Sequence, residues 1–393
     1  MQLGRIVASI GTTVVVGCAI AFSQRITWLG SLQPGFGSVA WGVAADGRTV
    51  VGVSGFAGQR RAFLWREGVG MQALPVFDGA VGSEAWNVSD DGRYVVGTIL
   101  NSNWQYQNIR WDTQTGTFQN LGTFGGAEGR AFGISADGSV VVGYAFGSGG
   151  AYFAYRWTQG GGLVSSGAPY SWAYGVSADG QTVVGLHYNP GVRAFRWRGD
   201  SFQEIGIGVA YATNANGSVV VGITFNAANQ QKAFVWREGQ PMQVLPDFGN
   251  VAVANDVSDD GSVIVGEATL PGVGRRAVRW TSAGIEDLNT TYAHLLADGS
   301  TLFTATRISA TGRFIVGFGR HNNLDQAYLL DTRACASANG DVDQNGCVNN
   351  ADLLSVLFAF GQAGSSLPED VNCDGQVNNA DLLTILFNFG GGC

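Results

Sequence analysis

The sequence has 393 residues, which is enough for two or three domains. Glycine is abundant at 60 residues, but aromatic residues make up 11% of the chain. The composition therefore excludes a disordered glycine-rich chain, which would lack the apolar mass for a core. The formal net charge of −8 argues against nucleic acid as a partner, because binding to phosphates needs a basic surface.

The first 23 residues have the pattern of a secretory signal peptide. Arg5 precedes an apolar run over residues 6–22, and small residues suit cleavage before Gln24. Two other interpretations stay open, a retained membrane anchor and a lipoprotein box that ends at Cys18. No later segment is apolar enough over enough residues to cross a bilayer. We therefore expect a secreted or cell-surface bacterial protein with no membrane span after signal cleavage.

Seven copies of one pattern fill the middle of the chain, as in "AFGISADGSVVVG". Every copy closes on a glycine twelve residues after its opening alanine, and the copies begin about 37 to 51 residues apart. The opening alanines are Ala40, Ala85, Ala131, Ala173, Ala210, Ala254 and Ala305. Asp-Gly or Asn-Gly in most copies predicts a tight hairpin turn, which accounts for the repeated aspartates without a catalytic role. These aspartates include Asp46, Asp91, Asp137 and Asp179.

Each copy continues into an apolar run that ends in tryptophan in six of the seven repeats, and then into a further short run. The tryptophans are Trp65, Trp111, Trp157, Trp197, Trp236 and Trp280. Val, Ile, Phe, Tyr and Trp dominate these runs, which favours strands. One repeat thus predicts four short antiparallel strands, the content of a propeller blade. A position filled by tryptophan in six blades is expected to pack between sheets.

The two ends of the repeat region are complementary. Residues 26–38 match the segment that precedes later repeats, whereas the seventh repeat has only three strands and ends near Leu330. The sequence therefore predicts a mainly β fold, a seven-bladed β-propeller over residues 24–333. The N-terminal strand around residues 26–29 would complete the seventh blade and remove exposed sheet edges. An open β-solenoid is the alternative, but it gives no reason for a split repeat.

The repeat resembles a bacterial family of extracellular repeats named for a His-Ala-Phe signature, with "RAFLW" and "KAFVW" at that place. The resemblance implies export and no particular activity.

The three histidines, His187, His294 and His321, show no metal-binding spacing. Off-repeat aromatics are expected in variable loops, where a polysaccharide or a surface protein would bind. They are Trp104, Tyr106, Tyr170, Trp172 and Tyr188. An insertion from Asn289 in the sixth repeat is a further candidate position.

Two C-terminal segments of twelve residues carry oxygen ligands with the spacing of an EF-hand loop, which indicates two Ca²⁺ sites. The first set is Asp341, Asp343, Asn345, Cys347 through its carbonyl, Asn349 and Asp352. The second set is Asp370, Asn372, Asp374, Gln376 through its carbonyl, Asn378 and Asp381. Gly346 and Gly375 stand at the sixth position, where the loop turns sharply. Each loop leads into an apolar helix, and no helix precedes it.

The helical segments and the cysteines are expected to stabilise this small unit. The valine and leucines of the repeated "VNNADLL" are expected to build a small two-helix core, and apolar residues at helical spacing lie on one face of each helix. These residues are Leu353, Leu354, Leu357 and Phe358 in the first helix, and Leu382, Leu383, Leu386 and Phe387 in the second. Four cysteines remain after export, and an even number in a small exported module indicates disulfides, with three pairings open. They are Cys335, Cys347, Cys373 and Cys393.

The tandem loop-helix arrangement over residues 334–393 resembles a type I dockerin. The resemblance implies binding to a cohesin-like domain of another protein. In that family, loop positions 10 and 11 lie at the recognition surface, and here they are Asn350-Ala351 and Asn379-Ala380. Both pairs differ from the Ser-Thr pairs common in cellulosomal dockerins. A calcium-stabilised tail without a partner is the simpler interpretation.

Two functions follow as hypotheses. The first is a secreted binding or display protein, in which the propeller meets a ligand and the tail docks the chain. The second is a carbohydrate-active enzyme, a glycoside hydrolase or lyase, with a propeller catalytic domain. An acidic cluster in the propeller channel that breaks the repeat pattern would favour the enzyme.

Overall fold

The structure is a computed structural model that describes residues 24–188, 190–332, 340–343, 345–362, 367–371 and 376–393. The chain divides into two compact units, Gln24–Arg333 and a unit that contains Ala334–Cys393. The predicted signal peptide lies outside the described residues. Among the described residues, no helix is both long enough and apolar enough to cross a membrane.

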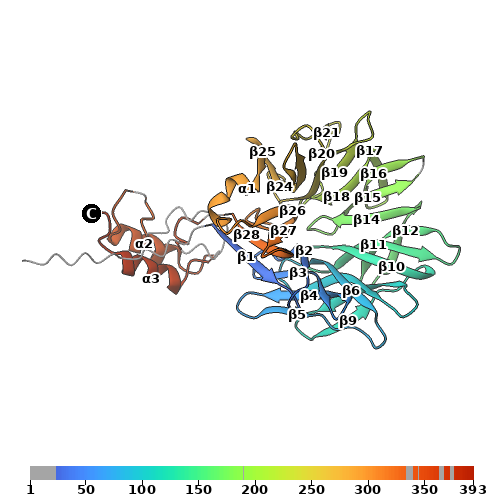
Figure 1. The fold of residues 1–393 in the computed structure, drawn as a ribbon, viewed down its shortest axis with the longest axis horizontal. Coiled ribbons are helices and arrows are strands. Elements are labelled where there is room, and N and C mark those ends of the chain that lie inside the picture. Colours follow the sequence, from blue (N-terminus) through green and yellow to red (C-terminus); the bar gives the residue numbers. More distant parts are fainter. Residues whose placement is uncertain (1–23, 189, 333–339, 344, 363–366, 372–375) are drawn as a thin grey trace, which may run out of the picture. The chain divides into compact units, whose positions relative to one another are not determined.

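The larger unit consists of seven four-stranded antiparallel sheets arranged around a centre (Figure 1). Blade 1 contains β2 (Ser38–Val43), β3 (Thr49–Phe56), β4 (Gln59–Arg66) and β5 (Gly70–Ala73). Blade 2 contains β6 (Gly82–Val88), β7 (Tyr94–Leu100), β8 (Tyr106–Asp112) and β9 (Thr117–Asn120). Blade 3 contains β10 (Gly125–Ile134), β11 (Val140–Gly147), β12 (Tyr152–Thr158) and β13 (Gly162–Pro169). Blade 4 contains β14 (Ser171–Val176), β15 (Thr182–Tyr188), β16 (Val192–Arg198) and β17 (Ser201–Ile207).

The remaining blades follow the same order, except that the last blade is shared between the two ends of the unit. Blade 5 contains β18 (Val209–Thr213), β19 (Val219–Phe225), β20 (Gln231–Arg237) and β21 (Gln243–Val244). Blade 6 contains β22 (Ala252–Val257), β23 (Ile264–Leu270), β24 (Gly274–Thr281) and β25 (Gly284–Asp287). Blade 7 contains β26 (Thr301–Ile308), β27 (Phe314–His321), β28 (Leu324–Asp331) and the N-terminal β1 (Arg25–Gly30).

The N-terminal strand closes the ring. Strand β1 pairs antiparallel with β28, with Ile26 opposite Leu330 and Trp28 opposite Tyr328. The innermost strand of blade 1 also packs against blade 7. The prediction of a seven-bladed propeller completed by the N-terminal strand is confirmed, and the open solenoid is excluded.

Every innermost strand carries a β-bulge at the same repeat position. The bulge falls between Ala40 and Gly42 in β2, and at the equivalent point in β6, β10, β14, β18, β22 and β26. The glycine that closes each repeat lies on the neighbouring strand. A Cβ atom at Gly143 would stand 1.9 Å from the carbonyl oxygen of Arg130, and the other six closing glycines are equally tight. The repeated glycine is therefore required by close backbone approach.

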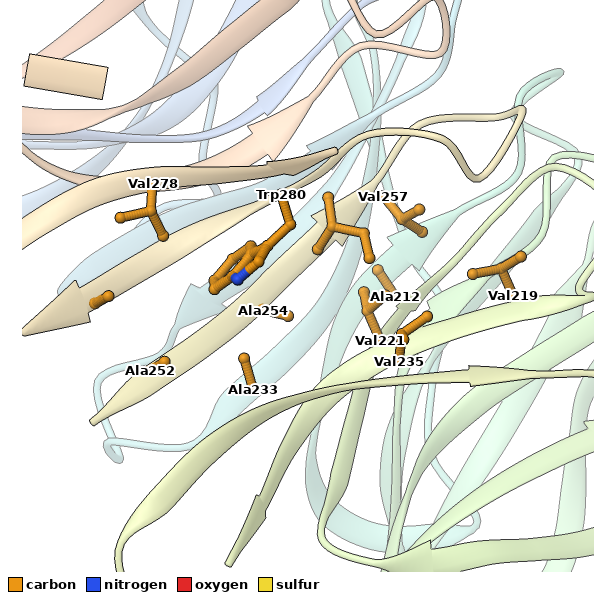
Figure 2. Close-up of a cluster of buried hydrophobic side chains, with 12 residues drawn as sticks. Ala212, Val219, Val221, Ala233, Val235, Ala252, Ala254, Val257, Val278 and Trp280 are labelled. Atoms are coloured by element: carbon orange, nitrogen blue, oxygen red, sulfur yellow. The ribbon is translucent and has the colours of Figure 1, made fainter. Parts of the chain in front are cut away.

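The core lies between neighbouring blades. Trp111 is fully buried, and the other five repeat tryptophans are buried as well, which confirms their predicted packing role. Figure 2 shows Trp280 of blade 6 beside Ala254, facing Val221 and Val235 of blade 5. The Nε1 atom of Trp280 donates to the carbonyl oxygen of Pro246 over 2.7 Å, so the indole keeps a partner in an apolar layer.

The insertion in blade 6 is a packing element. It forms α1 (Leu288–Thr291) and the 3-10 turn η1 (Ala293–Leu295). Leu288, Tyr292 and Leu296 are buried in the core that blade 6 shares with blade 7. The hairpin turns also behave as predicted, since the Asp137 carboxylate accepts from the backbone N–H of Ser139 over 2.9 Å.

The smaller unit contains α2 (Asn350–Ala359) and α3 (Asn379–Asn388), each preceded by one predicted calcium loop. Its core is built from small aliphatic residues: Val342, Val348, Val356, Ala359, Val371, Val377 and Ile385. Val348 and Val377 belong to this core as predicted, whereas the prediction is wrong for Leu354 and Leu383. Leu353 and Leu382 are half-buried against the core, whereas Leu354, Leu357, Phe358, Leu383, Leu386 and Phe387 are exposed.

Candidate functional site

The first predicted calcium loop gathers its carboxylates. One oxygen from each of Asp341, Asp343 and Asp352 lies within 4.8 Å of the others, a group that could hold a metal ion. Asp341 and Asp352 are buried, and Asp343 is exposed. The sharp turn that the sequence predicts is present, because Gly346 has φ of +90°. Its backbone N–H donates to Asp341 Oδ2 over 2.9 Å, which fixes that carboxylate inside the loop.

The other predicted ligands of this loop border the same group. The side-chain amide of Asn345 donates to Asp343 Oδ2 over 2.9 Å. Asn349 is the N-cap of α2, and its Oδ1 atom accepts from the backbone N–H of Ala351 over 2.8 Å. Its amide nitrogen donates to the carbonyl oxygen of Cys347 over 3.0 Å. Asn349 thus joins the loop to the start of the helix.

Asp352 is held by the backbone at both ends of the loop. Its Oδ1 atom accepts from Val342 N over 2.7 Å and its Oδ2 atom accepts from Asn349 N over 2.9 Å. The second of these bonds completes a capping box for α2. Burial alone would raise the pKa of Asp352, but these backbone N–H groups outweigh it and lower the pKa. The lowered pKa keeps this buried carboxyl in its anionic form.

The second loop repeats this arrangement in the part that the structure describes. Asp370 and Asp381 are buried, and Asp381 Oδ2 accepts from Asn378 N over 2.8 Å. The amide nitrogen of Asn378 donates to the carbonyl oxygen of Gln376 over 3.4 Å, as its counterpart does in the first loop. Asn372 and Asp374 lie outside the described residues.

A disulfide joins the first loop to the C-terminus. It links Cys347 with Cys393, at a Cα–Cα distance of 4.7 Å. The backbone of Val348 pairs alongside, since its N–H donates to Gly391 O over 2.9 Å and its carbonyl accepts from Gly390 N over 2.8 Å. Cys335 and Cys373 lie outside the described residues. A disulfide is consistent with an oxidising compartment.

The predicted recognition pairs are exposed and border an apolar surface. Asn350 and Ala351 begin α2, and Asn379 and Ala380 begin α3, all with side chains open to solvent. One helical face continues each pair into exposed apolar residues, namely Leu354, Leu357 and Phe358 in α2, and Leu383, Leu386 and Phe387 in α3. The exposed fractions of Phe358 and Phe387 are 83% and 84%, so the two copies present matching surfaces.

The bulges of the propeller direct one side chain per blade into the central channel. These seven residues are Trp41, Trp86, Phe132, Tyr174, Tyr211, Asn255 and Thr306, and all of them line one pocket of about 560 Å³. Blades 1 to 5 supply aromatic rings, and blades 6 and 7 supply polar groups. The sequence contains a signal for this set that the expectations above do not include, because the residue after each opening alanine is aromatic in five copies.

A second, smaller cavity beside the channel pocket contains carboxylates. A cavity of about 80 Å³ is bordered by Asp90, Asp256 and Asp259, and Arg307 borders both this cavity and the larger pocket. Asp90 and Asp259 occupy a repeat position that is alanine in the other five blades. Burial raises the pKa of Asp256, although Arg307 Nη1 lies 3.5 Å from its carboxylate. Burial and the charge of Asp256 likewise raise the pKa of Asp259.

Asp90 should make stability depend on pH. Burial and then the negative charges of Asp259 and Asp91 raise its pKa to about 6, so between pH 4 and pH 6 the folded chain holds a proton that the unfolded chain has lost. The free energy of unfolding therefore falls as pH rises through this range. We expect Asp90→Asn to stabilise the protein by about 1–2 kcal/mol at pH 7.5 and by almost nothing at pH 4, after allowing for partial solvent screening.

Denaturant unfolding at pH 4, 5, 6 and 7.5 measures this effect. Asp78→Asn removes the same charge at an exposed loop position and serves as the control. An equal gain for Asp90→Asn at pH 4 and pH 7.5 would show that the raised pKa is not its cause.

The off-repeat aromatics separate into two groups. Trp104, Tyr170 and Tyr188 are exposed, and Trp104 borders a second pocket of about 450 Å³ together with Tyr106. Three of the five do not lie in loops as expected, because Tyr106 begins β8, Tyr188 ends β15, and Trp172 belongs to β14. Trp172 lies in this inner strand and lines the channel pocket. Its position precedes the repeat alanine, so the repeat places it on the channel side.

The histidines take separate positions. His187 is buried, with Nε2 3.0 Å from a carboxylate oxygen of Glu204, whereas the His321 ring stacks on Trp28 at a centroid distance of 4.7 Å. His294 lies in η1. Among the described residues of the propeller, no three His, Cys, Asp or Glu side chains form a group that could hold a metal.

Comparison with known proteins bears on the fold of the larger unit. No protein-family model matches the sequence, and no curated protein sequence matches it. An oligogalacturonate lyase solved in complex with manganese is similar in structure, with a TM-score of 0.54 and 13% identity over 80% of this chain and 94% of the lyase. The β-propeller domain of the Trilobed protease from Pyrococcus furiosus has a TM-score of 0.52 and 9% identity, over 79% of this chain and 96% of that domain. At these identities the likeness shows the fold alone, and the larger unit is a β-propeller.

Proposed function

We propose that this chain is an exported binding and display protein whose C-terminal unit docks to a cohesin-like domain in a calcium-dependent manner. The observation that carries the proposal is the duplicated surface of the small unit. Each loop is followed by a helix with an exposed Asn-Ala pair and an exposed Leu, Leu and Phe on one face. Exposed apolar surface of this kind is characteristic of protein interaction sites.

The donor set of the loops supports calcium as the metal. Asp341, Asp343 and Asp352 offer carboxylate oxygens, and the Cys347 carbonyl lies at the loop position that supplies a backbone ligand in calcium loops. Ca²⁺ prefers six to eight such oxygens, and its charge would offset the repulsion among the carboxylates. The buried Asp370 and Asp381 offer the same chemistry in the second loop.

Calcium binding is tested on the full-length chain by isothermal titration calorimetry. We expect two Ca²⁺ per chain in the wild type, one in Asp341→Ala or Asp370→Ala, and none in the double variant. Calcium should also raise the unfolding temperature of the small unit, since a ligand that binds only the folded state stabilises it. A stoichiometry other than two, or binding by the double variant, would overturn the assignment.

Docking is tested with a panel of purified cohesin domains in the presence of calcium or EDTA. Because the two helices carry matching faces, the partner should accept either one. Phe358→Ser and Phe387→Ser should each weaken binding less than about tenfold, whereas the double variant should lose more than about 100-fold. Val69→Ser, at an exposed position of the propeller, is the control. Binding that survives the double variant, or no cohesin binding with both calcium sites filled, contradicts the proposal.

A second function, a carbohydrate-active enzyme, is favoured by the acidic residues of the channel. Asp90, Asp256 and Asp259 break the repeat pattern, and burial is the main cause of the raised pKa of each, as general acids require. Incubation with a polysaccharide panel, assayed for new reducing ends and new double bonds, tests this. Turnover that Asp256→Asn removes would establish an enzyme and overturn the display function. No turnover on any substrate would leave the carboxylates with a structural role.

A further inference from the structure

We propose that the channel pocket of the propeller binds an oligosaccharide that carries carboxylate groups, through an aromatic arc and the guanidinium group of Arg130. This inference rests on the proposed role of the propeller as the ligand-binding part of the chain. The ligand class follows from three properties of the pocket, which are its aromatic side, its polar side and its local charge.

The aromatic side is a continuous arc across five blades. Neighbouring ring centroids lie 5.0 Å apart for Trp41 and Trp86, 5.3 Å for Trp86 and Phe132, and 5.2 Å for Phe132 and Tyr174. Tyr211 extends the arc, at 5.5 Å from Tyr174. Burial raises the pKa of Tyr211 to about 12 and keeps the phenol neutral. Neighbouring rings are tilted or edge-on to one another, at interplanar angles from 33° to 82°, so the arc is a curved wall of separate rings rather than one flat surface. Such rings can receive the C–H groups of a sugar.

The opposite side presents hydrogen-bonding groups from blades 6 and 7. Asn255, Thr304, Thr306 and Glu267 line it, together with Arg275. Glu267 is fixed in place, because its Oε2 atom accepts from the Thr304 hydroxyl over 2.5 Å and lies 3.7 Å from Arg275 Nη1. A sugar ring needs both kinds of wall, an apolar wall for one face and planar polar groups for its hydroxyls. The Asn255 amide and the Thr306 hydroxyl donate to backbone carbonyl oxygens, which leaves their oxygen atoms as acceptors for the hydroxyl groups of a sugar.

The charge of the pocket selects an acidic sugar. Arg130, Arg275 and Arg307 line it with Glu267 as the single carboxylate, although the whole chain has a formal net charge of −8. Arg275 pairs with Glu267, and Arg307 pairs with Asp256 over 3.5 Å. Among the described residues Arg130 forms no salt bridge, and its guanidinium lies 3.4 Å from the centroid of the Tyr106 ring. Arg130 is therefore the cation available to a ligand carboxylate.

Several donors at the pocket wall have no protein acceptor. The Nε1 atoms of Trp41, Trp86 and Trp172 and the Nε atom of Arg130 are covered by protein and make no hydrogen bond to it. Such groups are uncommon in folded proteins. Oxygen atoms of a bound sugar are the kind of acceptor that these donors lack. Hydroxyl and carboxylate oxygens supply acceptors, which a hydrocarbon or a cationic ligand does not.

The size of the pocket limits the ligand to a short chain. A volume of about 560 Å³ falls within the usual range for small-molecule sites. It suits a few sugar units or the end of a longer polysaccharide. Each repeat contributes one bulge residue to the pocket, five of them aromatic and two polar, so the seven bulges that shape the inner strands also build the site.

The test is isothermal titration calorimetry of the full-length chain with trisaccharides of galacturonate, mannuronate and glucuronate. The methyl esters of the same trisaccharides remove only the charge, and citrate supplies carboxylates without a sugar ring. We expect at least one uronate trisaccharide to bind at least about tenfold more tightly than its ester, with no binding of citrate. No binding of any uronate, equal binding of the ester, or citrate binding of similar strength would overturn the proposal.

Variants separate the contribution of the Arg130 charge from that of the aromatic rings. Arg130→Gln should weaken uronate binding about 10- to 100-fold and leave ester binding unchanged, since a charge-assisted hydrogen bond is lost. Trp86→Ala should weaken both about tenfold, whereas Trp86→Phe, which keeps a flat ring, should retain most of the affinity. Arg198→Gln, at an exposed site outside the pocket, is the matched control. Unchanged uronate binding in Arg130→Gln and Trp86→Ala contradicts the assignment, provided that both unfold at the wild-type temperature.

Calorimetry with a variant that lacks both calcium sites distinguishes failure of the sugar site from failure of the proposed docking function. The Asp341→Ala and Asp370→Ala double variant should keep full uronate affinity while it loses calcium and docking. Mass spectrometry of the trisaccharide after titration should show it unchanged. A cleaved product would retain the pocket but overturn the non-enzymatic display function.

Discussion

Replacing Gly143 by alanine is expected to destabilise the propeller by at least about 3 kcal/mol. A Cβ atom at this position would stand 1.9 Å from the carbonyl oxygen of Arg130, and that atom belongs to backbone that cannot rotate away. The clash also falls beside the bulge that holds Phe132 in the channel. The strand pair must separate or the bulge must be lost, and both cost ladder hydrogen bonds and packing.

Gly149→Ala is the matched control, because no atom lies within 4 Å of a Cβ placed there. Denaturant unfolding with tryptophan fluorescence measures both variants. The control should stay within about 0.5 kcal/mol of the wild type. If Gly143→Ala unfolds at the same denaturant concentration as Gly149→Ala, the close approach does not determine the repeated glycine. Folded Gly143→Ala should also bind the uronate ligand less tightly, because the bulge positions the arc.

The positions of the repeats along the sequence explain why the architecture could be predicted. The sequence shows that the seventh repeat lacks a fourth strand and that an extra strand precedes the first repeat, and ring closure follows from these two facts. The bulge is not visible, because a bulge is a property of paired strands. Trp41 and Trp86 therefore looked like ordinary strand residues, although the bulge directs them into the channel.

The C-terminal unit shows the opposite case. The spacing of its acidic residues is readable from the sequence, and Asp341, Asp343 and Asp352 come together in a group that could hold a metal ion. Periodicity does not reveal which face of α2 is inside, since Leu354 and Phe358 are more apolar than the buried Val356 and Ala359. The backbone pairs across the two halves, since Val348 before α2 pairs with residues 390–391 after α3, and Val377 before α3 pairs with residues 361–362 after α2. This pairing, which periodicity does not show, accompanies the burial of the smaller residues. Burial of the small residues leaves the large ones exposed.

A chain that begins at Ser31, and so lacks β1, is expected to lose about 5 kcal/mol of stability relative to one that begins at Gln24. Leu29 of β1 is buried, and Ile26 and Trp28 pack against the core of blade 7. Each apolar side chain of this kind contributes about 1.5–3 kcal/mol when it is fully buried. Loss of β1 also exposes the edge of β28, which pairs with β1 along its length.

Thermal unfolding and size-exclusion chromatography measure the consequence. The shortened chain should unfold at a lower temperature and associate through the free edge of β28. A synthetic peptide of residues 24–30, added in excess, should restore the unfolding temperature and the monomer, while a peptide of the same composition in scrambled order should not. The recovery should saturate at one peptide per chain, because only one blade lacks a strand. A shortened chain that stays monomeric with an unchanged unfolding temperature would mean that the ring closes without the N-terminal strand.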